Sequence, residues 1–383
     1  MMKKLLFFVL IAAFLAGSGA EAAPVSVPEN AARAYILVDG GTGEALAERR
    51  AHDRFAPASV TKIMTMLLVA EALDAGQYAR EDPVTASERA AGMGGSQIWL
   101  KPGEVFTVEE LLKTVAVVSA NDAAVALAEF TAGSEESFVE RMNDKAVYLG
   151  MLDTHFENCT GLPAEGHLTS AYDVALMSRA LLEHKWITSF TSIGTDTIRD
   201  GKMELVNTNK LIRTYDGATG LKTGFTQEAR YCLSASAERE GTSLIAVVLG
   251  GDTSALRFEA AASLLNYGFA NYRTVDLLEN AGEAPESLPV INGKEDAVSI
   301  GVEGGARVLL PRAKLAGLRY ELDLPEKLPA PVEKGQSVGK LSVWSGEELL
   351  LEKDFTALEP VEAEGFFDVF RGLLRRVFLE SAA

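Results

Sequence analysis

The sequence of 383 residues predicts an α/β domain, followed by a small all-β sandwich domain and an amphipathic C-terminal helix. Segments of β type lie near residue 34 and again between residues 220 and 249, with helical patterns between them. Strands early, helices in the middle and strands late predict a sheet that combines strands from both ends of the domain. After about residue 275, proline and glycine separate short β-type segments, which is typical of an all-β unit.

The first elements of the α/β domain follow from local patterns. Residues 34–39 predict a strand, and the glycine-rich turn 40–43 returns the chain into a second strand over residues 44–48. Apolar residues at helical spacing predict a helix over residues 59–73. One face of this helix would be buried, formed by Ile63, Met66, Leu67 and Ala70.

The later elements have recognisable start signals. Thr107-Val108-Glu109-Glu110 resembles a capping box for a helix that ends near residue 118, and Ser170 begins a similar signal. The remaining expected elements are strands over residues 220–226, 230–237 and 243–249 and a helix over residues 254–267. We therefore divide the chain into a signal peptide (1–23), the α/β domain (24–274), the all-β domain (275–360) and the terminal helix (361–383).

The N-terminus has the pattern of a secretory signal. Lys3 and Lys4 precede an uncharged apolar run over residues 5–15, and Ala20-Glu21-Ala22 has small residues at the spacing that a signal peptidase requires. We expect cleavage after Ala22 or Ala23 and a mature protein outside the cytoplasmic membrane. The alternative is an uncleaved membrane anchor, for which the apolar run is short.

The C-terminus predicts a helix that lies in a membrane interface. At helical spacing, Asp368, Arg375 and Arg376 fall opposite an apolar arc. Arginines of such a helix would lie near anionic headgroups, so the outer surface of the cytoplasmic membrane is an expected partner. The alternative is a terminal helix packed on the core of its own protein. The arc consists of Phe366, Phe367, Phe370, Leu373, Leu374, Val377 and Phe378.

Composition excludes several classes of function. There are 36 lysines and arginines against 54 aspartates and glutamates, which gives a formal net charge of −18 at pH 7. Because no broad basic surface is expected, nucleic acid is not an expected partner. Two cysteines and four histidines provide neither a disulfide framework nor an obvious zinc site. We expect no metal, no cofactor, and Cys159 and Cys232 as buried free thiols rather than a disulfide.

Ser59-Val60-Thr61-Lys62 is the first of three motifs that could support chemistry. Ser59 and Lys62 are one helical turn apart, so both side chains would emerge on the same face. A serine hydroxyl needs a base to act as a nucleophile, and a lysine among apolar walls and other cations can lose its proton near pH 7. The alternative interpretation is a helix cap at Ser59 and a solvated Lys62.

Ser119-Ala120-Asn121 interrupts a helical run, and Lys222-Thr223-Gly224 lies on an expected strand. Ser119 could pass a proton between Lys62 and a leaving group, and the Asn121 amide could hold Lys62 and a substrate carbonyl. Lys222 could hold positive charge in the cleft. The alternative interpretations are a helix cap for Ser119-Ala120-Asn121 and a strand end for Lys222-Thr223-Gly224.

The third motif also offers contacts to an extended substrate. Thr223 could donate to a substrate carboxylate, and Gly224 would let the substrate lie against the strand edge. The backbone N–H groups of Phe225 and Ser59 would be candidate oxyanion donors.

These motifs together resemble those of β-lactamases and penicillin-binding proteins. The closest resemblance is to the low-molecular-weight penicillin-binding proteins, the D-alanyl-D-alanine carboxypeptidases of peptidase family S11. It covers nearly the whole chain, the all-β domain and terminal helix included. The segments that resemble this family are Met93-Gly94-Gly95-Ser96-Gln97, Ser119-Ala120-Asn121-Asp122-Ala123-Ala124, Asn158-Cys159-Thr160-Gly161-Leu162, Thr219-Gly220-Leu221-Lys222-Thr223-Gly224-Phe225-Thr226 and Pro331-Val332-Glu333-Lys334-Gly335.

The resemblance implies a serine β-lactamase/transpeptidase-like fold and a serine carboxypeptidase that acts on peptidoglycan pentapeptide stems. Ser59 would attack the D-Ala-D-Ala bond, Lys62 would act as the base, and Ser119 would pass the proton to the departing D-alanine. Lys222 and Thr223 would bind the terminal carboxylate, and β-lactam antibiotics would acylate Ser59.

Two further positions bear on this resemblance. Arg257 resembles a carboxylate-binding arginine of the family, with a surface helix arginine as the alternative. Phe225 stands where some members have histidine.

Four other functions remain open from sequence. A serine β-lactamase shares the three motifs, but no Glu-x-x-Leu-Asn string of the class A enzymes lies between the second and the third. A non-catalytic wall-binding protein could retain the fold. An endopeptidase or a transpeptidase would use the same chemistry with a different leaving group or acceptor.

Overall fold

The structure, a computed structural model, describes residues 32–278, 285–367, 369 and 370. Contacts divide the chain into two compact units, one that ends at Asn271 and one that begins at Tyr272. The predicted signal peptide (1–23) and residues 371–383 of the predicted terminal helix lie outside the described residues. No helix within the described ranges is both long enough and apolar enough to cross a membrane.

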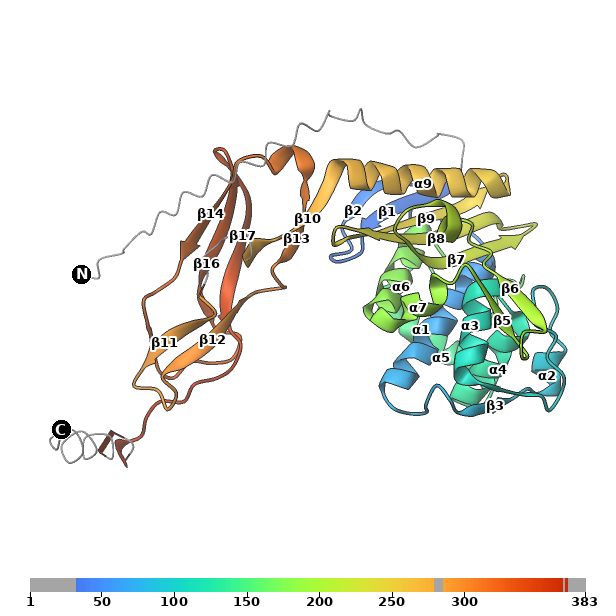
Figure 1. Cartoon of the computed structure of the whole chain (residues 1–383), viewed down its shortest axis with the longest axis horizontal. Helices are drawn as coiled ribbons and strands as arrows, with labels where there is room; N and C mark the ends of the chain where they lie inside the picture. Colours follow the sequence, from blue (N-terminus) through green and yellow to red (C-terminus); the bar gives the residue numbers. More distant parts are fainter. Residues whose placement is uncertain (1–31, 279–284, 368, 371–383) are drawn as a thin grey trace. The chain divides into compact units, whose positions relative to one another are not determined.

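Along the chain, the first unit consists of an early hairpin, then a set of helices and then three late strands (Figure 1). Its elements are β1 (Ala34–Asp39), β2 (Ala45–Arg49), η1 (Ala58–Thr61), α1 (Lys62–Asp74), β3 (Pro83–Thr85), α2 (Glu88–Ala91), β4 (Val105–Thr107), α3 (Val108–Val118), α4 (Asn121–Ala132), α5 (Glu135–Tyr148), α6 (Ala171–Glu183), η2 (Lys185–Ile187), α7 (Thr188–Thr191), β5 (Thr195–Ile198), β6 (Met203–Val206), α8 (Leu211–Thr214), β7 (Ala218–Thr226), β8 (Arg230–Arg239), β9 (Thr242–Gly251) and α9 (Ser254–Asn271).

The five-stranded sheet of this unit confirms the predicted topology. Its order is β2-β1-β9-β8-β7, and every neighbouring pair is antiparallel. β1 therefore pairs with β9, more than two hundred residues later in the chain. Helix α9 covers one face of the sheet, and α6 packs on the opposite face together with the other helices (Figure 1).

The helix of the first motif differs from its prediction in two respects. An α-helix over residues 59–73 was expected, but residues 58–61 form the 3₁₀ turn η1 and the α-helix begins at Lys62. The helix is also not amphipathic, because it is surrounded by α3, α4, α5, α6 and β7. All residues from Lys62 to Ala70 are buried, whichever direction they face. A central helix of this kind is apolar all round.

Start signals of two other helices are confirmed in detail. Thr107 and Glu110 form a reciprocal capping box at the start of α3, and Ser170 accepts a hydrogen bond from the Asp173 N–H at the start of α6. These caps fix where α3 and α6 begin. Because α3 also ends at Val118, as predicted, the Ser119 motif falls at its C-terminus.

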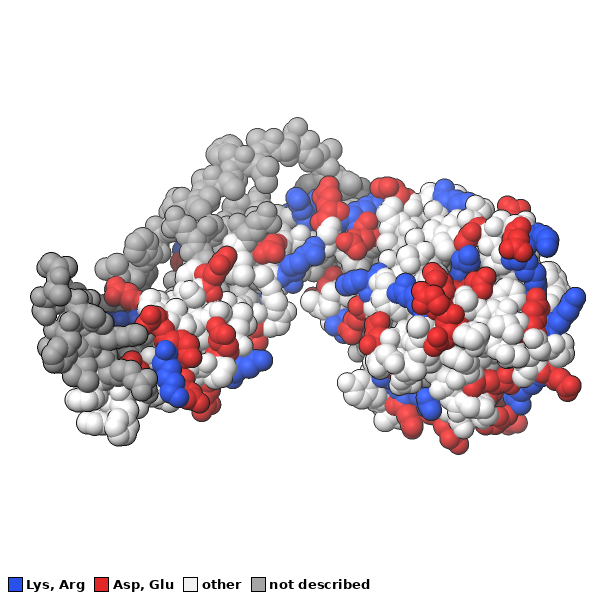
Figure 2. Space-filling view, turned by 60° about the horizontal axis from the view of Figure 1, so that its bottom comes forward, with Lys and Arg blue, Asp and Glu red and all other residues white. Residues whose placement is uncertain are grey.

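The second unit is the predicted all-β region and has its own apolar core. Its larger sheet has the order β14-β16-β17-β12-β11-β15, and β10 pairs with β13 in a smaller one. Its elements are β10 (Tyr272–Asp276), β11 (Ser287–Ile291), β12 (Ala297–Val302), β13 (Arg307–Pro311), η3 (Arg312–Lys314), β14 (Leu318–Asp323), β15 (Leu328–Pro329), β16 (Ser337–Ser345) and β17 (Glu348–Ala357). On the face shown in Figure 2, basic side chains are interspersed with acidic ones.

A buried histidine ties the turn η1 to the segment before α6. His167 Nδ1 accepts from the Glu157 N–H at 2.9 Å, so its Nε2 carries the proton and donates to Thr61 Oγ1 at 2.8 Å. Thr61 Oγ1 in turn donates to the Ala58 carbonyl at 2.9 Å. This chain of donors requires the neutral imidazole, and burial lowers the pKa of His167 to about 4.

We predict that His167 makes stability fall in weak acid. The unfolded chain binds a proton at this residue near pH 6.5 but the folded chain only near pH 4, so unfolding becomes easier as pH falls through this window. The loss should be at most about 3 kcal/mol in the free energy of unfolding. Urea titrations between pH 7 and pH 4 measure it, and His167→Gln should flatten the dependence.

The exposed His52 provides the control, because its side chain is 63% exposed and its charge is not among the causes of the His167 shift. His52→Gln should leave the difference in pH dependence between the wild type and His167→Gln in place. An unchanged pH dependence in His167→Gln would contradict the assignment.

Candidate active site

Ser59 lies in the turn η1, directly before the buried helix α1. The turn begins at Ala58, whose φ of 49° is unusual for a residue with a side chain. Ser59 is partly exposed, whereas Val60, Thr61 and Lys62 are buried. The motif therefore presents one hydroxyl to the solvent side and directs Lys62 inward.

Lys62 Nζ lies within hydrogen-bonding distance of three oxygens. It donates to Ser59 Oγ at 3.1 Å, to Asn121 Oδ1 at 2.6 Å and to the Thr160 carbonyl at 2.7 Å. All three acceptors are uncharged and Lys62 is fully buried, so burial lowers the pKa of Lys62 to about 7. A lysine with such a pKa can accept a proton from the neighbouring serine at neutral pH.

Asn121 is oriented by contacts on both ends of its amide. Nδ2 donates to the Gly94 carbonyl at 2.6 Å, which leaves Oδ1 facing Lys62. Its backbone N–H donates to the Ser96 carbonyl at 2.7 Å. The helix-cap interpretation of Asn121 is wrong, because Asn121 is the first residue of α4 and the N-cap is Ala120.

Ser119 occupies the C-cap of α3 in the left-handed region, with φ 65° and ψ 32°. Its side chain is buried, and Oγ has no hydrogen-bond partner among the residues that the structure describes. The backbone position is thus that of a cap, but the hydroxyl caps nothing. A buried hydroxyl without a partner is costly and is free to exchange a proton with a bound molecule.

The third motif lies in the middle of β7, at the edge of the sheet. Burial lowers the pKa of Lys222 well below its usual range, and the nearby charges of Lys62 and Arg257 act in the same direction. Lys222 Nζ donates to the Thr223 carbonyl at 3.0 Å, and Thr223 Oγ1 donates to Thr208 Oγ1 at 2.7 Å. An anion bound here would relieve the repulsion between the cations.

Two glycines allow the strand and a neighbouring loop to approach Ser59. A Cβ on Gly224 would lie 2.9 Å from the Pro57 carbonyl oxygen and 3.1 Å from the Ser59 nitrogen. A Cβ on Gly161 would lie 1.8 Å from the Ala58 carbonyl oxygen, and the φ of Gly161 is +81°. Both positions therefore exclude a side chain.

Phe225 belongs to the same strand, and Arg257 of α9 holds the strand at Gly224. Arg257 Nη1 donates to the carbonyls of Gly224 at 2.9 Å and Cys232 at 3.3 Å, and the residue is 7% exposed. The surface-arginine alternative is therefore wrong. Phe225 is 46% exposed and its ring lies 4.4 Å from that of Tyr231.

Sequence reasoning missed several groups of the site. The Thr160 carbonyl and the Thr208 hydroxyl had no separate signal, although Thr160 lies within a segment that resembles the family. Asp122 was also missed: its buried carboxylate accepts from the N–H groups of Ile98 and Leu100 at 3.0 Å each. The position of Asp122 directly after Asn121 was the available signal.

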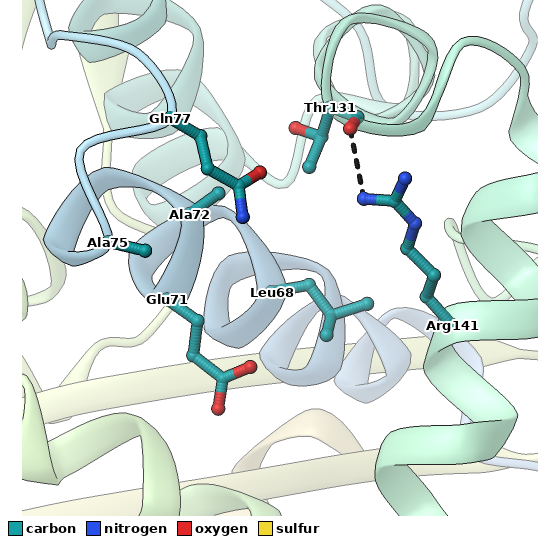
Figure 3. A pocket seen from close by; sticks show the side chains of 7 residues that line it. All are labelled: Leu68, Glu71, Ala72, Ala75, Gln77, Thr131 and Arg141. Carbon is teal, nitrogen blue, oxygen red and sulfur yellow. Dashed lines mark hydrogen bonds between the residues drawn. The ribbon is translucent and has the colours of Figure 1, made fainter.

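The two cysteines and a hollow of the first unit lie outside the three motifs. Cys159 and Cys232 are buried free thiols. Within residues 32–278, 285–367, 369 and 370, no cluster of three histidine, cysteine or acidic side chains could hold a metal ion. A hollow of about 250 Å³ lies at the far end of α1 from Ser59, and none of the three motifs contributes to its lining (Figure 3). Its lining residues are Leu68, Glu71, Ala72, Ala75, Gln77, Thr131 and Arg141.

Comparison with known families matches both units. Residues 21–253 match the peptidase S11 family, described as D-alanyl-D-alanine carboxypeptidase. Residues 272–363 match the C-terminal domain of penicillin-binding protein 5.

Individual relatives agree with these matches. The D-alanyl-D-alanine carboxypeptidase DacF of Bacillus subtilis is 42% identical over 339 residues, which is 88% of this chain and 87% of that protein. DacC of Escherichia coli, with the same description, is 36% identical over 90% of this chain and 87% of its own length. The crystal structure of penicillin binding protein 5 from Haemophilus influenzae has a TM-score of 0.74 at 31% identity, covering 88% of this chain and 99% of that one.

We predict that Gly161→Ala strongly destabilises the first unit. The added methyl group would overlap the Ala58 carbonyl oxygen and would also be held at a positive φ. The expected loss in the free energy of unfolding is about 3 kcal/mol, measured by urea denaturation. Gly150→Ala is the control, because its φ is +75° but no atom lies within 4 Å of the added Cβ. Gly150→Ala should lower the free energy of unfolding by about 1 kcal/mol. Equal losses in the two variants would contradict the close approach of the Ala58 carbonyl to Gly161.

Proposed function

The chain belongs to the D-alanyl-D-alanine carboxypeptidase family of serine peptidases, and from this premise we propose the residues that carry out its reaction. The activity is removal of the terminal D-alanine from peptidoglycan stem peptides through an acyl-enzyme. β-Lactams acylate the same serine. The proposal concerns the roles of Ser59, Lys62 and Ser119 and of the groups that bind the substrate.

The single observation on which the proposal rests is the pairing of Ser59 with a buried lysine. Lys62 Nζ lies 3.1 Å from Ser59 Oγ, and burial lowers the pKa of Lys62 to about 7. Neutral Lys62 takes the hydroxyl proton while Ser59 Oγ attacks the carbonyl carbon of the D-Ala-D-Ala bond. The contacts of Nζ to Asn121 and to the Thr160 carbonyl keep it in place during this transfer.

Collapse of the tetrahedral intermediate requires a proton on the departing amine. Ser119 Oγ, buried and without a partner in the described part of the chain, donates it and is reprotonated from Lys62. The N–H groups of Ser59 and Phe225 stabilise the oxyanion, and Gly224 supports this role because it lets β7 approach the Ser59 nitrogen. Water then hydrolyses the ester on Ser59 and releases the shortened stem peptide.

The terminal carboxylate of the substrate binds at Lys222 and Thr223. Lys222 supplies positive charge, and the Thr223 hydroxyl turns from Thr208 to donate to the carboxylate while Thr208 donates to Thr223 in return. Arg257, behind Gly224, adds its charge to this anion site and holds the strand through the Gly224 carbonyl. The Asn121 amide lines the same side of the site as Lys62.

The enzyme is extracytoplasmic, and we propose that residues 361–383 attach it to the outer face of the cytoplasmic membrane. The described part of this segment supports the proposal with exposed aromatic side chains. Phe366 is 79% exposed, Phe367 77% and Phe370 51%. Three exposed aromatic rings within five residues favour binding to a membrane interface, because the interface removes the rings from water.

We predict that Ser59→Ala abolishes turnover. The mature protein, incubated with a pentapeptide that ends in D-Ala-D-Ala, should release free D-alanine, and Ser59→Ala should lower the rate by at least about 1,000-fold. Penicillin labelling that persists in Ser59→Ala would show that the nucleophile is a different residue.

We predict that Lys62→Ala retains the nucleophile but lacks the base. Its acylation by penicillin should fall by about 100-fold or more, while its circular dichroism spectrum stays unchanged.

We predict that Phe366→Glu/Phe370→Glu in the mature protein weakens binding to phosphatidylglycerol vesicles by at least about 10-fold, because it places two charges on the apolar arc. Sedimentation with the vesicles measures the bound fraction. Tyr148→Glu is the control, since Tyr148 is an aromatic side chain 81% exposed on α5. Equal binding by all three proteins would contradict membrane attachment through this segment.

A further inference from the structure

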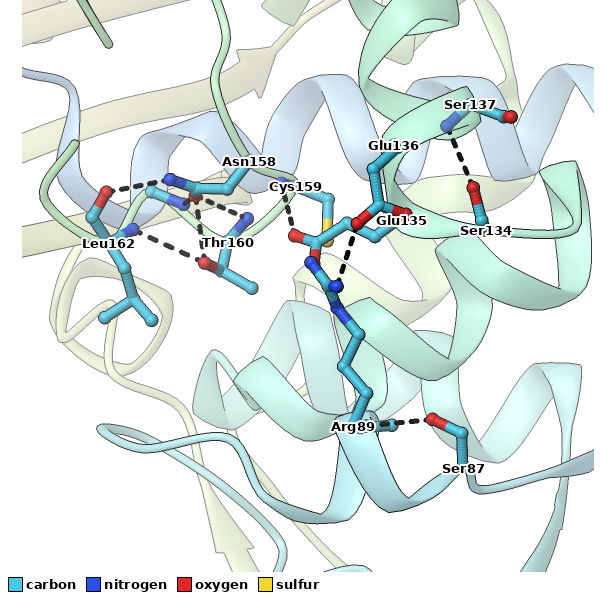
Figure 4. A network of polar contacts seen from close by, with 12 residues as sticks. Ser87, Arg89, Ser134, Glu135, Glu136, Ser137, Asn158, Cys159, Thr160 and Leu162 are labelled. Atoms are coloured by element: carbon cyan, nitrogen blue, oxygen red, sulfur yellow. Dashed lines mark hydrogen bonds and ion pairs between the residues drawn. The ribbon is translucent and has the colours of Figure 1, made fainter. Parts of the chain in front are cut away.

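The Thr160 carbonyl that holds Lys62 belongs to a loop fixed from several directions. Asn158 Oδ1 accepts from the N–H groups of Thr160 and Gly161 at 3.1 and 2.7 Å, which closes the loop on itself. On the side of α1, Thr65 Oγ1 donates to the Cys159 carbonyl at 2.6 Å. The opposite side of the loop is held by Glu135, the first residue of α5 (Figure 4).

Glu135 is a buried carboxylate with partners on both oxygens. Oε2 accepts from Arg89 Nη2 at 2.6 Å and from Nε at 3.0 Å, a two-pronged ion pair from α2. Oε1 accepts from the Cys159 N–H at 3.2 Å and from its thiol at 3.3 Å. Arg89 thus compensates the buried negative charge of Glu135 through Oε2, while Oε1 remains available to bind Cys159 of the loop.

Cys159 acts in this arrangement as a donor and not as a nucleophile. Burial, and next the charge and hydrogen bond of Glu135, raise the pKa of the Cys159 thiol well above its usual range. The thiol therefore stays protonated and donates to Glu135. A thiolate here would raise the pKa of the adjacent Lys62, so the protonated thiol helps the pKa of Lys62 to stay low.

We propose that Glu135, held by Arg89, is a positioning residue for the catalytic lysine. It fixes the N–H and the thiol of Cys159, so that the carbonyl of the next residue, Thr160, stays 2.7 Å from Lys62 Nζ and the loop seals Lys62 from water. This inference rests on the proposed function, because it assigns Lys62 as the base. Asp122, Cys159 and Lys222 are the other titratable groups near Lys62, and the variants below leave all three in place.

The neighbouring Glu136 is a matched control on the same helix. It also pairs with Arg89, at 2.8 Å, but its side chain is 67% exposed. It makes no hydrogen bond to residues 158–162 in the described part of the chain. Substitution of Glu136 therefore removes one ion pair of Arg89 and leaves the loop untouched, whereas substitution of Glu135 removes the support of the loop.

The test measures the rate constant for acylation by benzylpenicillin between pH 5 and pH 10. In the wild-type protein this rate should rise with a midpoint near pH 7, the pKa of Lys62. In Glu135→Ala, water reaches Lys62 and raises its pKa, because desolvation is the main cause of the low value. We expect a midpoint higher by about one pH unit, a rate at pH 7 lower by about 10-fold, and recovery to within about threefold above pH 9.

Two further variants complete the experiment. Glu135→Gln keeps an acceptor for the Cys159 N–H but loses the charge, so its midpoint should shift in the same direction by a smaller amount, and it serves if Glu135→Ala does not fold. Glu136→Ala should retain the wild-type profile.

The outcomes separate the inference from the proposed function. An unchanged midpoint in both Glu135 variants, or a loss that is uniform at every pH in folded protein, would overturn the positioning role. A wild-type protein that neither reacts with benzylpenicillin nor releases D-alanine would instead overturn the proposed function.

Discussion

Burial of the Lys62 ammonium among uncharged acceptors is the interaction on which the rest of the site depends. The group has three hydrogen bonds, to a hydroxyl, an amide and a backbone carbonyl, and none of these oxygens carries a full charge. Such an environment disfavours the protonated form, so burial lowers the pKa of Lys62 to about 7. A helix that is apolar on every side is needed to exclude water from it, which explains why α1 lies at the centre of the helices.

The same constraint applies to the proposed anion site on β7. Lys222 is also fully buried, and the charges of Lys62 and Arg257 add to burial in lowering its pKa. Two lysines and an arginine close to one another are stable only at a cost, which an anionic substrate end would offset. This arrangement supports the proposal that the site binds a carboxylate at one end and accepts a proton at the other. This division matches the two ends of the scissile D-Ala-D-Ala unit.

Sequence reasoning succeeded where the signal was local. The spacing of Ser59 and Lys62, the capping box at Thr107, the hairpin after Asp39 and the three late strands all depend on residues a few positions apart. It failed where a contact joins distant segments. For Arg257 the sequence left open both a carboxylate-binding arginine and a surface helix arginine, and only the packing of α9 against β8 and β9 buries it. The sequence predicts an amphipathic helix for the first motif, because it does not show that other helices surround α1 on every side.

By itself, the sequence determined the types of reactive group, the order of the elements and the family to which the chain belongs. Tertiary structure alone decided that Lys62 meets the Thr160 carbonyl, 98 residues away, and that Glu135 reaches the Cys159 backbone. Side-chain identity specifies what a group can donate or accept, but a backbone carbonyl is present at every residue and leaves no mark in sequence. The pKa of Lys62 depends on water exclusion and on such carbonyls, and both exist only once the chain has folded.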